Sequence, residues 1–388
     1  MTPDDDNQQW QPDPDDLIVL SKSARRRRAR ERALPTWGET PHQTQARRTA
    51  LFKDLALKCG FSRVGIARAQ ALPDAQSHLE GWLAAGQQGT MAWLADDVAR
   101  RCDPQQVTPG AQSVVVLALD YDSDAPRTQQ VALADADRAW ISRYAWGDDY
   151  HVVMERRLKQ LEVALTAALK PELGEDFRGP GGPIQPFKAL RDLRWMVDHG
   201  PILEREWAVR SGIGWRGKHS LVVHPRHGSF FFLACMVTSI ALDPDEMLGD
   251  HCGTCTACLD ACPTRAIVAP YIVDARLCIS HTTIELPGAI PPDARPLVGD
   301  QVFGCDICQD VCPWNRFSAP GDPAFAPRPG LVAPKLDDLV AMDAATFASQ
   351  FAQSPLKRRG LEGLQDNARA VREFRSIRRR KEPGDNPA

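Results

Sequence analysis

Cysteine spacing constrains this chain more than any other feature of its sequence. One stretch, HCGTCTACLDACP, carries the pattern C-x₂-C-x₂-C-x₃-C-P, and a later one, GCDICQDVCPW, carries C-x₂-C-x₃-C-P. Three closely spaced thiolates can hold three corners of a [4Fe–4S] cluster, and the cysteine before the proline ligates the other cluster in two-cluster ferredoxins. The spacing therefore predicts two clusters that exchange ligands. The predicted ligands are Cys252, Cys255, Cys258 and Cys312 for the first cluster, and Cys262, Cys278, Cys305 and Cys308 for the second.

Zinc is the alternative occupant of such thiolates. Zinc modules usually space two C-x₂-C pairs by about 15–20 residues, whereas here three cysteines fall within seven residues, from Cys252 to Cys258. The pattern therefore favours iron–sulfur. Two adjacent clusters would form a relay for single electrons. A ferredoxin-like electron carrier remains open on this evidence, but the preceding residues 47–245 are more than a carrier needs and indicate an additional catalytic domain.

Composition limits where such a relay would work. The segment after Met1 is acidic and lacks the apolar region of a secretory signal, and no apolar run of about 18 residues is present to span a membrane. The chain has 11 cysteines, and the cytosol keeps thiols reduced, which argues against a disulfide framework. We therefore expect a cytoplasmic protein, and nothing in the sequence indicates more than a monomer.

Four segments differ in composition. Residues 1–46 are polar and charge-blocked and are predicted to be disordered. Residues 47–245 alternate helical and strand patterns and are predicted to form one α/β domain. Residues 246–317 form the cysteine-rich insert, and residues 318–388 are rich in proline and then helical and basic.

Within the α/β domain, periodicity predicts individual elements. A helix begins near residue 49 and stops at Gly60, and a second, long amphipathic helix covers residues 149–169. A buried strand is predicted at residues 113–121 and a helix at 203–212. The stretches SLVVHP and SFFFLACMVTSI, separated by a turn at residues 225–228, predict a strand pair.

The stretch SGIGWRGKHS has the sequence pattern of a nucleotide-binding loop. It contains G-x-G-x-x-G at Gly212, Gly214 and Gly217, but such loops follow a strand and precede a helix. Here a helical pattern comes first and a strand pattern follows. We therefore set a nucleotide aside and expect the glycines to let the backbone approach another flat or bulky ligand closely.

The chain from residue 47 to about residue 375 resembles the epoxyqueuosine reductase family. The resemblance rests on many blocks in order, which makes it more specific than the cysteine motif alone. These blocks are SVVVLALDY, ISRYAWGDDYH, VDHGPILER, GIGWRGKHSL, HGSFFFL, CGTCTACLDACPTRAI, CISHTTIE, FGCDICQDVCPWNRF and SPLKRRGLEGLQDNA.

The resemblance implies a fold and an activity. The fold would be a nitroreductase-like, reductive-dehalogenase-like cobalamin-binding domain of α+β or α/β class, with an inserted bacterial-ferredoxin-like domain and a helical basic C-terminus. The family reduces the epoxide of epoxyqueuosine, at the wobble position of tRNA, to the alkene of queuosine. It uses base-off cobalamin, two [4Fe–4S] clusters and an external low-potential electron donor. The protein carries and positions the cofactor, which performs the difficult step.

Particular residues match the family's site. Asp198, in VDHGP, matches the proton donor, and its pKa would have to be raised for work as an acid near neutral pH. Without the resemblance, an Asp in a loop before Gly-Pro would be read as a turn or helix cap. The implied cobalamin contacts are Arg101, Tyr121, Arg143, Asp198, Trp215, Lys218, Ser220, Val222 and His224.

Two positions depart from the family pattern. His224 stands where the family commonly has Asn, and Cys235 where it commonly has Glu. An imidazole raises the question of a cobalt ligand, but the family coordinates cobalt with no protein side chain, so we expect none here.

The basic C-terminal segment suits a tRNA partner. From Pro355 to Lys381 the chain has ten Lys or Arg against three acids, and each cation near a phosphate releases counterions. A solvated amphipathic helix is the alternative. The predicted RNA contacts are Lys357, Arg358, Arg359, Arg369 and Arg372. Besides the electron carrier, a small-molecule corrinoid reductase of the dehalogenase type also stays open; such enzymes usually carry an export signal.

Overall fold

The centre of the fold is a four-stranded antiparallel sheet in the order β1-β2-β7-β4. The computed structural model describes residues 40–127, 137–173, 193–318 and 320–381. The strands are β1 (Arg63–Arg68), β2 (Ser113–Asp120), β7 (Phe231–Thr238) and β4 (Leu193–Met196). Strand β2 is buried along nearly its whole length, which explains its continuous run of valine and leucine, since both of its faces are covered.

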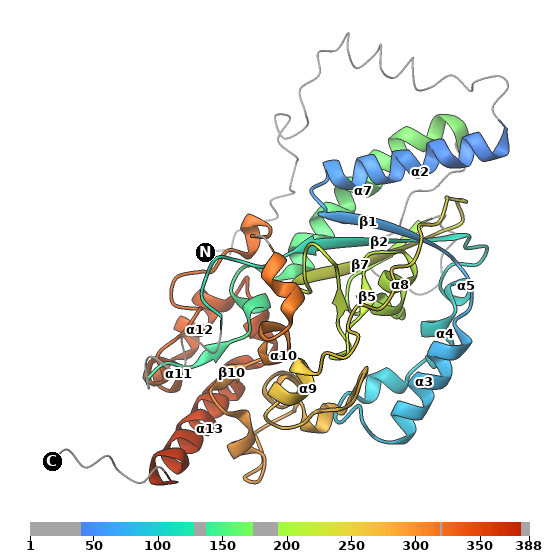
Figure 1. Ribbon diagram of the computed structural model, residues 1–388. Helices are drawn as coiled ribbons and strands as arrows, with labels where there is room; N and C mark the ends of the chain where they lie inside the picture. Colours follow the sequence, from blue (N-terminus) through green and yellow to red (C-terminus); the bar gives the residue numbers. More distant parts are fainter. Residues whose placement is uncertain (1–39, 128–136, 174–192, 319, 382–388) are drawn as a thin grey trace, which may run out of the picture.

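Helices cover both faces of this sheet (Figure 1). On one face, α2 (Pro41–Lys58) and α7 (Tyr150–Leu173) pack against Val115, Leu117 and Leu119 of β2. On the other face, the intervening Val114, Val116 and Ala118 pack with Trp207 of α8 (Glu204–Arg210). Because successive side chains of a strand point to opposite faces, the single apolar run of β2 contributes side chains to two cores. The helices α3 (Pro73–Ala84), α4 (Val98–Cys102) and α5 (Pro104–Val107) complete the second face.

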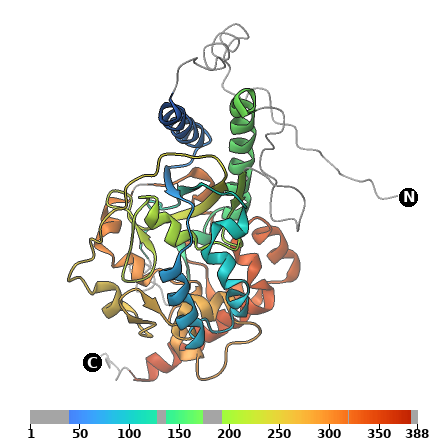
Figure 2. The same cartoon turned by 90° about the vertical axis from the view of Figure 1, so that its right-hand side faces the viewer.

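A third core lies beside the sheet and unites distant parts of the chain. Strand β3 (Trp140–Ile141) pairs in parallel with β10 (Gln301–Phe303). The two pack with α11 (Leu336–Ala341), α12 (Ala344–Phe351) and α13 (Gly360–Lys381). Helices α2 and α13 lie at opposite ends of the molecule in both views (Figures 1 and 2). Because β10 falls within the predicted insert, the end of that insert packs into the third core.

The cysteine-rich region is built from short elements. Helices α9 (Ala257–Ala261) and α10 (Ile307–Asp310) contact each other, and β8 (Ile267–Ala269) pairs with β9 (Ile272–Val273). A second hairpin, β5 (Trp215–Arg216) with β6 (Val222–Val223), leads from α8 toward this region. The remaining short helical turns are η1 (Ala92–Ala95), η2 (Arg143–Ala145), η3 (Ala275–Leu277), η4 (His281–Glu285), η5 (Arg295–Val298), η6 (Pro313–Phe317), η7 (Pro323–Phe325) and η8 (Pro355–Arg358). None of the helices in the described ranges has the length and apolarity to cross a membrane.

Most predicted elements are confirmed. The strand at 113–121 is β2, the helices at 149–169 and 203–212 are α7 and α8, and the basic C-terminal helix is α13. The first helix also ends as expected, with Gly60 at a positive φ of 87° just beyond it.

Two expectations need correction. First, α2 starts at Pro41, before the predicted boundary at residue 46, because Thr40 and Gln43 form a reciprocal capping box that satisfies free amides of the first turn. Residues 1–39 lie outside the described residues. Second, the two stretches around residues 225–228 share only a bridge between His224 and Gly228, while β6 pairs with β5 and β7 lies inside the sheet.

Candidate functional site

Asp198 lies immediately beyond the end of β4 and has a left-handed backbone, with φ of 57°. Aspartate tolerates this conformation better than most residues. Its carboxylate accepts a hydrogen bond from the Tyr150 hydroxyl at 2.6 Å. Its backbone N–H donates to Oε1 of Glu204, also at 2.6 Å. The residue before α8 is Leu203, which makes no side-chain cap, so Asp198 does not serve as the cap of that helix.

The Asp198 side chain lies beside Tyr150, His151 and Glu204, and we call these surroundings the Asp198 recess. The side chain is 52% exposed, yet burial by surrounding protein is the largest single influence on its pKa. That burial opposes ionisation, but the nearby His151 and the hydrogen bond from Tyr150 outweigh it and lower the pKa of Asp198. In this structure Asp198 is therefore ionised at neutral pH, and the raised pKa expected beside a corrin stays a prediction.

His151 lies between two carboxylates. Its Nδ1 is 2.9 Å from Oδ1 of Asp149, and its Nε2 is 3.6 Å from Oδ2 of Asp198. Burial alone would lower the pKa of His151, but these two acids overcome it and raise the pKa to about 9. His151 is therefore a cation at neutral pH. Sequence reasoning missed Asp149, Tyr150 and His151, although all three lie in the ISRYAWGDDYH block.

Two further ionisable side chains, Glu204 and Arg205, lie near Asp198. Burial, with Asp198 nearby, raises the pKa of Glu204 to about 8, so this carboxyl is largely protonated at neutral pH. Burial also lowers the pKa of Arg205. The Arg205 guanidinium donates to the carbonyl oxygen of Ser220 at 3.2 Å, and Ser220 has a positive φ of 68°.

The hairpin at residues 215–223 is packed more deeply than a cofactor-contacting segment requires. Trp215 and Val222 are buried, and the Trp215 ring lies 5.0 Å from that of Trp314, edge to face. Both side chains thus pack against protein, while the indole nitrogen of Trp215 is buried without a hydrogen-bond partner in the part of the chain that the structure describes. Their contact with a corrin stays a prediction.

The glycines before and within this hairpin also serve internal packing. A Cβ at Gly214 would lie 2.3 Å from the carbonyl oxygen of Val223, and one at Gly212 would lie 2.4 Å from that of Glu246. A Cβ at Gly217 would meet the His219 ring at 2.8 Å. The glycines thus allow close packing within the protein, and the predicted approach of a ligand to this backbone stays a prediction.

Lys218 and His224 have local partners. The Lys218 ammonium donates to the carbonyl oxygens of Gly253 at 2.6 Å and Cys255 at 2.9 Å, within the first cysteine run. The Nδ1 atom of His224 accepts from the backbone N–H of Arg226 at 3.1 Å. Burial, reinforced by the cations nearby, lowers the pKa of His224 to about 3, so its imidazole is neutral.

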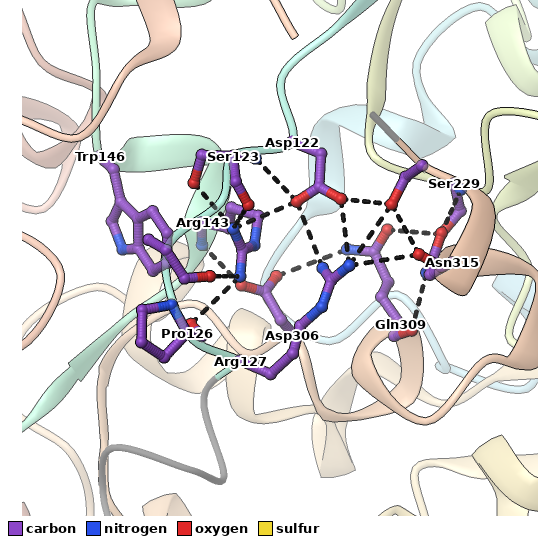
Figure 3. Close-up of polar contacts among 12 residues, drawn as sticks. Asp122, Ser123, Pro126, Arg127, Arg143, Trp146, Ser229, Asp306, Gln309 and Asn315 are labelled. Carbon is purple, nitrogen blue, oxygen red and sulfur yellow. Dashed lines mark hydrogen bonds and ion pairs between the residues drawn. The ribbon is translucent and has the colours of Figure 1, made fainter. Parts of the chain in front are cut away.

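Arg143 belongs to a buried polar network (Figure 3). Its guanidinium is 1% exposed and lies 3.1 Å from Asp122. It also donates to Ser123 and to the carbonyl oxygens of Ala125 and Pro126. Its Nε atom is buried without a hydrogen-bond partner among the described residues. Arg143 therefore has a structural role in this network, and its corrin contact stays a prediction.

The same network anchors the second cysteine run. Asp306, next to Cys305, accepts from the Ser142 hydroxyl at 2.6 Å. Asn315 accepts from the backbone N–H of Ser229 at 2.6 Å. Figure 3 shows Asp306, Asn315 and Ser229 around Asp122 and Arg143. The cysteine run is thus hydrogen-bonded to the start of β7 and to the segment before η2.

Tyr121 and Arg101, two further predicted cobalamin contacts, differ in their exposure to solvent. Tyr121 is buried at the end of β2 against Phe230 and Phe232. Arg101, on α4, is partly exposed, donates to the carbonyl oxygens of Asp96 and Trp93, and lies over the Trp93 ring.

The eight predicted cluster ligands fall into two neighbouring groups. Burial and then Cys252, Cys312 and Cys255 raise the pKa of Cys258 to about 11. Burial raises the pKa of Cys305, with contributions from Cys278 and Cys262.

The two groups also meet each other. The pKa of Cys308 is raised by burial and then by Cys305 and Cys278, with a further contribution from Cys258 of the other group. The exchange of ligands between the two runs stays a prediction. Among the described residues, no three His, Cys, Asp or Glu side chains converge tightly enough to hold a single metal ion.

Two of the predicted RNA contacts border the Asp198 recess. The Lys357 ammonium lies 2.9 Å from Asp149, and the Arg358 guanidinium lies 2.6 Å from Glu285; each cation is 49% exposed. Arg358 also helps to lower the pKa of Asp198. By contrast, Arg359 donates to the carbonyl oxygens of Leu286 and Gly288.

Arg369 and Arg372 lie along α13. Arg369 is exposed, and Arg372, also exposed, pairs with Asp337. The structure therefore separates the predicted basic surface into a part beside the recess and a part on the helix.

Comparison with known proteins places this site in a family. The model described as a 4Fe-4S double cluster binding domain matches residues 251–315, and that described as epoxyqueuosine reductase QueG, DUF1730, matches residues 101–178. The epoxyqueuosine reductase of Pseudomonas aeruginosa is 41% identical over 319 residues, covering 82% of each chain. The chain belongs to the epoxyqueuosine reductase family. The Escherichia coli member is 39% identical over 309 residues, 79% of this chain and 76% of its own.

Solved structures of epoxyqueuosine reductases share the fold. A selenomethionine-labelled epoxyqueuosine reductase superposes with a TM-score of 0.72 at 32% identity, covering 83% of this chain and 80% of its own. Another, solved with an epoxyqueuosine-modified tRNA-Tyr stem loop, gives 0.70 at 31% identity with the same coverage. The match to epoxyqueuosine reductases thus extends far beyond the cysteine region, which disfavours a simple electron carrier. The double-cluster match favours iron–sulfur over zinc.

Proposed function

We propose that this chain reduces epoxyqueuosine in tRNA to queuosine, as an oxidoreductase that delivers two electrons and a proton to the epoxide. The observation that carries this proposal is one recess that combines Asp198 at the end of β4 with the exposed cations Lys357 and Arg358. The recess offers an acidic group for chemistry and a basic rim for a polyanion.

Asp198 is the proposed proton donor to the departing epoxide oxygen. A carboxyl group in hydrogen-bond reach of that oxygen can act as a general acid. Tyr150 holds the carboxylate from one side at 2.6 Å, and Glu204 fixes the backbone of the same residue. These contacts would keep the carboxyl aimed into the recess while the substrate enters.

Cobalamin is the proposed cofactor, bound base-off. Asp198, Glu204 and Arg205 are accessible to solvent and could face such a group, although burial is the largest influence on the pKa of each. When bound, cobalamin would supply the low-valent cobalt that reduces the epoxide. Ser220 on the hairpin and His224 after it are candidate contacts, as are Arg101 and Tyr121, and Lys218 would act through the cysteine loop.

Two [4Fe–4S] clusters are the proposed route for electrons. Cys252, Cys255, Cys258 and Cys312 would hold one, and Cys262, Cys278, Cys305 and Cys308 the other. The proximity of Cys308 to Cys258 would place the clusters close enough for single-electron transfer between them. An external low-potential donor would load this relay.

The tRNA would bind across the basic rim with its anticodon loop toward the recess. Lys357 and Arg358 would contact phosphates, with Arg369 and Arg372 extending the track along α13. The protein would hold the target base splayed out of the loop, as is usual for enzymes that act on a base in single-stranded RNA.

Because the substrate is tRNA, we propose that the enzyme works in the cytoplasm. We also expect a monomer. The residue 47–245 domain is proposed to be nitroreductase-like.

The test is reconstitution with a defined substrate. Protein loaded with iron–sulfur clusters and cobalamin, given a low-potential donor and epoxyqueuosine-tRNA, should yield queuosine by nucleoside mass spectrometry. Asp198→Asn should lose this product while both clusters and the cobalamin stay bound. Absence of queuosine from the loaded wild-type protein would contradict the proposal. A halogenated phenol supplied in parallel tests the small-molecule reductase alternative.

A further inference from the structure

A chain of three side chains connects the protein interior to Asp198. Asp149 is 6% exposed, and its Oδ1 lies 2.9 Å from Nδ1 of His151. The opposite ring nitrogen, Nε2, lies 3.6 Å from Oδ2 of Asp198. The Tyr150 ring stacks on the imidazole with centroids 4.0 Å apart. The imidazole thus faces one carboxylate with each nitrogen.

Helix capping does not account for this arrangement. Asp149 does accept the backbone N–H of His151 at 3.1 Å at the start of α7, which is an ordinary capping contact. That contact uses only backbone of residue 151 and would exist with any side chain there. The contacts of both ring nitrogens need a different explanation.

The charges around His151 favour its cationic form. Asp149 and Asp198 raise its pKa to about 9 against the effect of burial, while Asp198 itself is held ionised. The other titratable groups nearby are His199, whose ring centroid is 5.7 Å away, Tyr150, the largely protonated Glu204, Lys357 on Asp149, and Arg358 beside Asp198. The resting pair is therefore an imidazolium beside a carboxylate, so the proposed acid lacks a proton of its own.

We propose that His151 is a positioning residue that orients Asp198 and supplies it with the proton that Asp198 then donates. This inference rests on the proposed function. Asp149 in turn fixes the ring by accepting from Nδ1–H, so that Nε2–H points at Asp198, as the buried carboxylate of a catalytic triad does for its histidine.

The proton balance of the step is simple. The Nε2–H proton moves to Oδ2 of Asp198, which converts an imidazolium–carboxylate pair into a neutral imidazole and a carboxylic acid. Asp198 then gives that proton to the departing oxygen and returns to a carboxylate, and His151 takes a proton from solvent. No electron moves within this chain.

Covering the recess would promote the transfer. Removing water disfavours both charged groups, so a corrin and a base seated over Asp198 would favour the neutral imidazole and acid over the ion pair. The proton would thus reach Asp198 when substrate is in place and stay on His151 otherwise.

The kinetic test uses the loaded enzyme, reduced beforehand, in single turnovers on epoxyqueuosine-tRNA from about pH 6 to about pH 10. The wild-type rate should fall as pH rises through about 9, because the required imidazolium, with its raised pKa, loses its proton there. His151→Gln should be slower by about 10²-fold. Its rate should also lack this fall at high pH, which we call the alkaline limb of the profile. Its KM for tRNA and its cobalamin content should match the wild type.

Two variants sharpen the result. Asp149→Asn keeps the imidazole but removes a carboxylate that raises its pKa. This variant should therefore react more slowly, and its alkaline limb should move to lower pH. His199→Gln removes the neighbouring imidazole and should keep the limb near pH 9. A rate for His151→Gln within about threefold of wild type, a persistent limb in that variant, or a change in KM or cobalamin content alone would overturn the proposal.

A measurement without turnover separates this inference from the proposed function. The ring nitrogens of ¹⁵N-histidine-labelled loaded protein, followed by NMR, should show His151 titrating near pH 9 and lower in Asp149→Asn. Titration of His151 near its ordinary pKa, about 6.5, would overturn the relay even if queuosine forms. A failure of wild-type turnover with the raised pKa intact would instead count against the proposed function.

Discussion

The ammonium of Lys218 lies 2.9 Å from the carbonyl oxygen of Cys255 and donates a hydrogen bond to it. The same ammonium donates to Gly253 at 2.6 Å. The carbonyl oxygen of Lys218 also accepts the backbone N–H of Tyr271 at 2.9 Å. One residue of the β5–β6 hairpin thus fixes the first cysteine run and the turn between β8 and β9.

Replacing Lys218 with Met should loosen the first cysteine run. Hydrogen bonds from a charged group contribute about 1.5–3 kcal/mol when buried, and partial exposure of this ammonium places its effect at the lower end. We expect the cluster of Cys252, Cys255 and Cys258 to be lost first on exposure to air. Iron content and electron paramagnetic resonance of the reduced clusters would report this.

Matched variants test the specificity of that loss. Lys218→Arg keeps a cationic donor and should retain more of the first cluster. Lys159→Met removes an exposed lysine on α7 and should leave both clusters intact. If Lys218→Met loses the second cluster first, or loses neither, the anchoring role is wrong.

Cys312→Ala should damage the first cluster, although Cys312 belongs to the second cysteine run. Burial and then the nearby Cys252 and Cys255 raise the pKa of Cys312, as expected if this thiol serves the first run. Cys278→Ala should damage the other cluster. Separate paramagnetic signals of the two clusters would distinguish these outcomes, and Cys59→Ala, away from both groups, serves as the control. Loss of the same cluster in both variants would contradict the exchange of ligands.

The predicted ligand grouping rests on thiolate spacing, which is a local property of the sequence. Each short turn between cysteines fixes where the next sulfur points, and the proline rule assigns Cys262 and Cys312 across the two runs. The strand β2 and the helix α7 were equally accessible, since their apolar periodicity is carried by neighbouring residues.

The cofactor surface could not be predicted in the same way, because it depends on burial created by distant segments. Arg143 looks like a free cation in sequence, but Asp122 and the carbonyl oxygens near residue 125 enclose it. Trp215 is enclosed by Trp314 of the second cysteine run. His151 was missed for the converse reason, since its carboxylate neighbour Asp198 is supplied by a strand end 47 residues later along the chain.

Replacing Arg143 with Met should destabilise the folded protein by about 3 kcal/mol. Removing one partner of a buried ion pair leaves the other charge uncompensated, and Asp122 is buried. The midpoint of urea unfolding should therefore fall. Asp122→Asn combined with Arg143→Met should be less destabilising than the sum of the single variants, because the two residues interact directly.

A neighbouring arginine supplies the control. Arg127 lies 3.1 Å from the same carboxylate but is more exposed, so Arg127→Met should cost closer to the roughly 1 kcal/mol of a surface pair. Equal losses for Arg127→Met and Arg143→Met would show that burial of the guanidinium is not the source of the effect.

Two adjacent arginines should respond differently to the loss of charge, and this contrast tests the proposed tRNA surface. Arg358 is 49% exposed and borders the Asp198 recess, whereas Arg359 is held by the carbonyl oxygens of Leu286 and Gly288 and by Asn367. Arg358→Gln should weaken tRNA binding and reduce the slope of log K against log salt by about 0.7–0.9, the value for one phosphate contact. Arg359→Gln should lower the unfolding midpoint but leave that salt slope unchanged.

Binding isotherms at several salt concentrations, together with urea unfolding of each variant, would test this contrast. An unchanged slope for Arg358→Gln would remove this arginine from the tRNA surface, and a reduced slope for a fully folded Arg359→Gln would assign the phosphate contact to its neighbour.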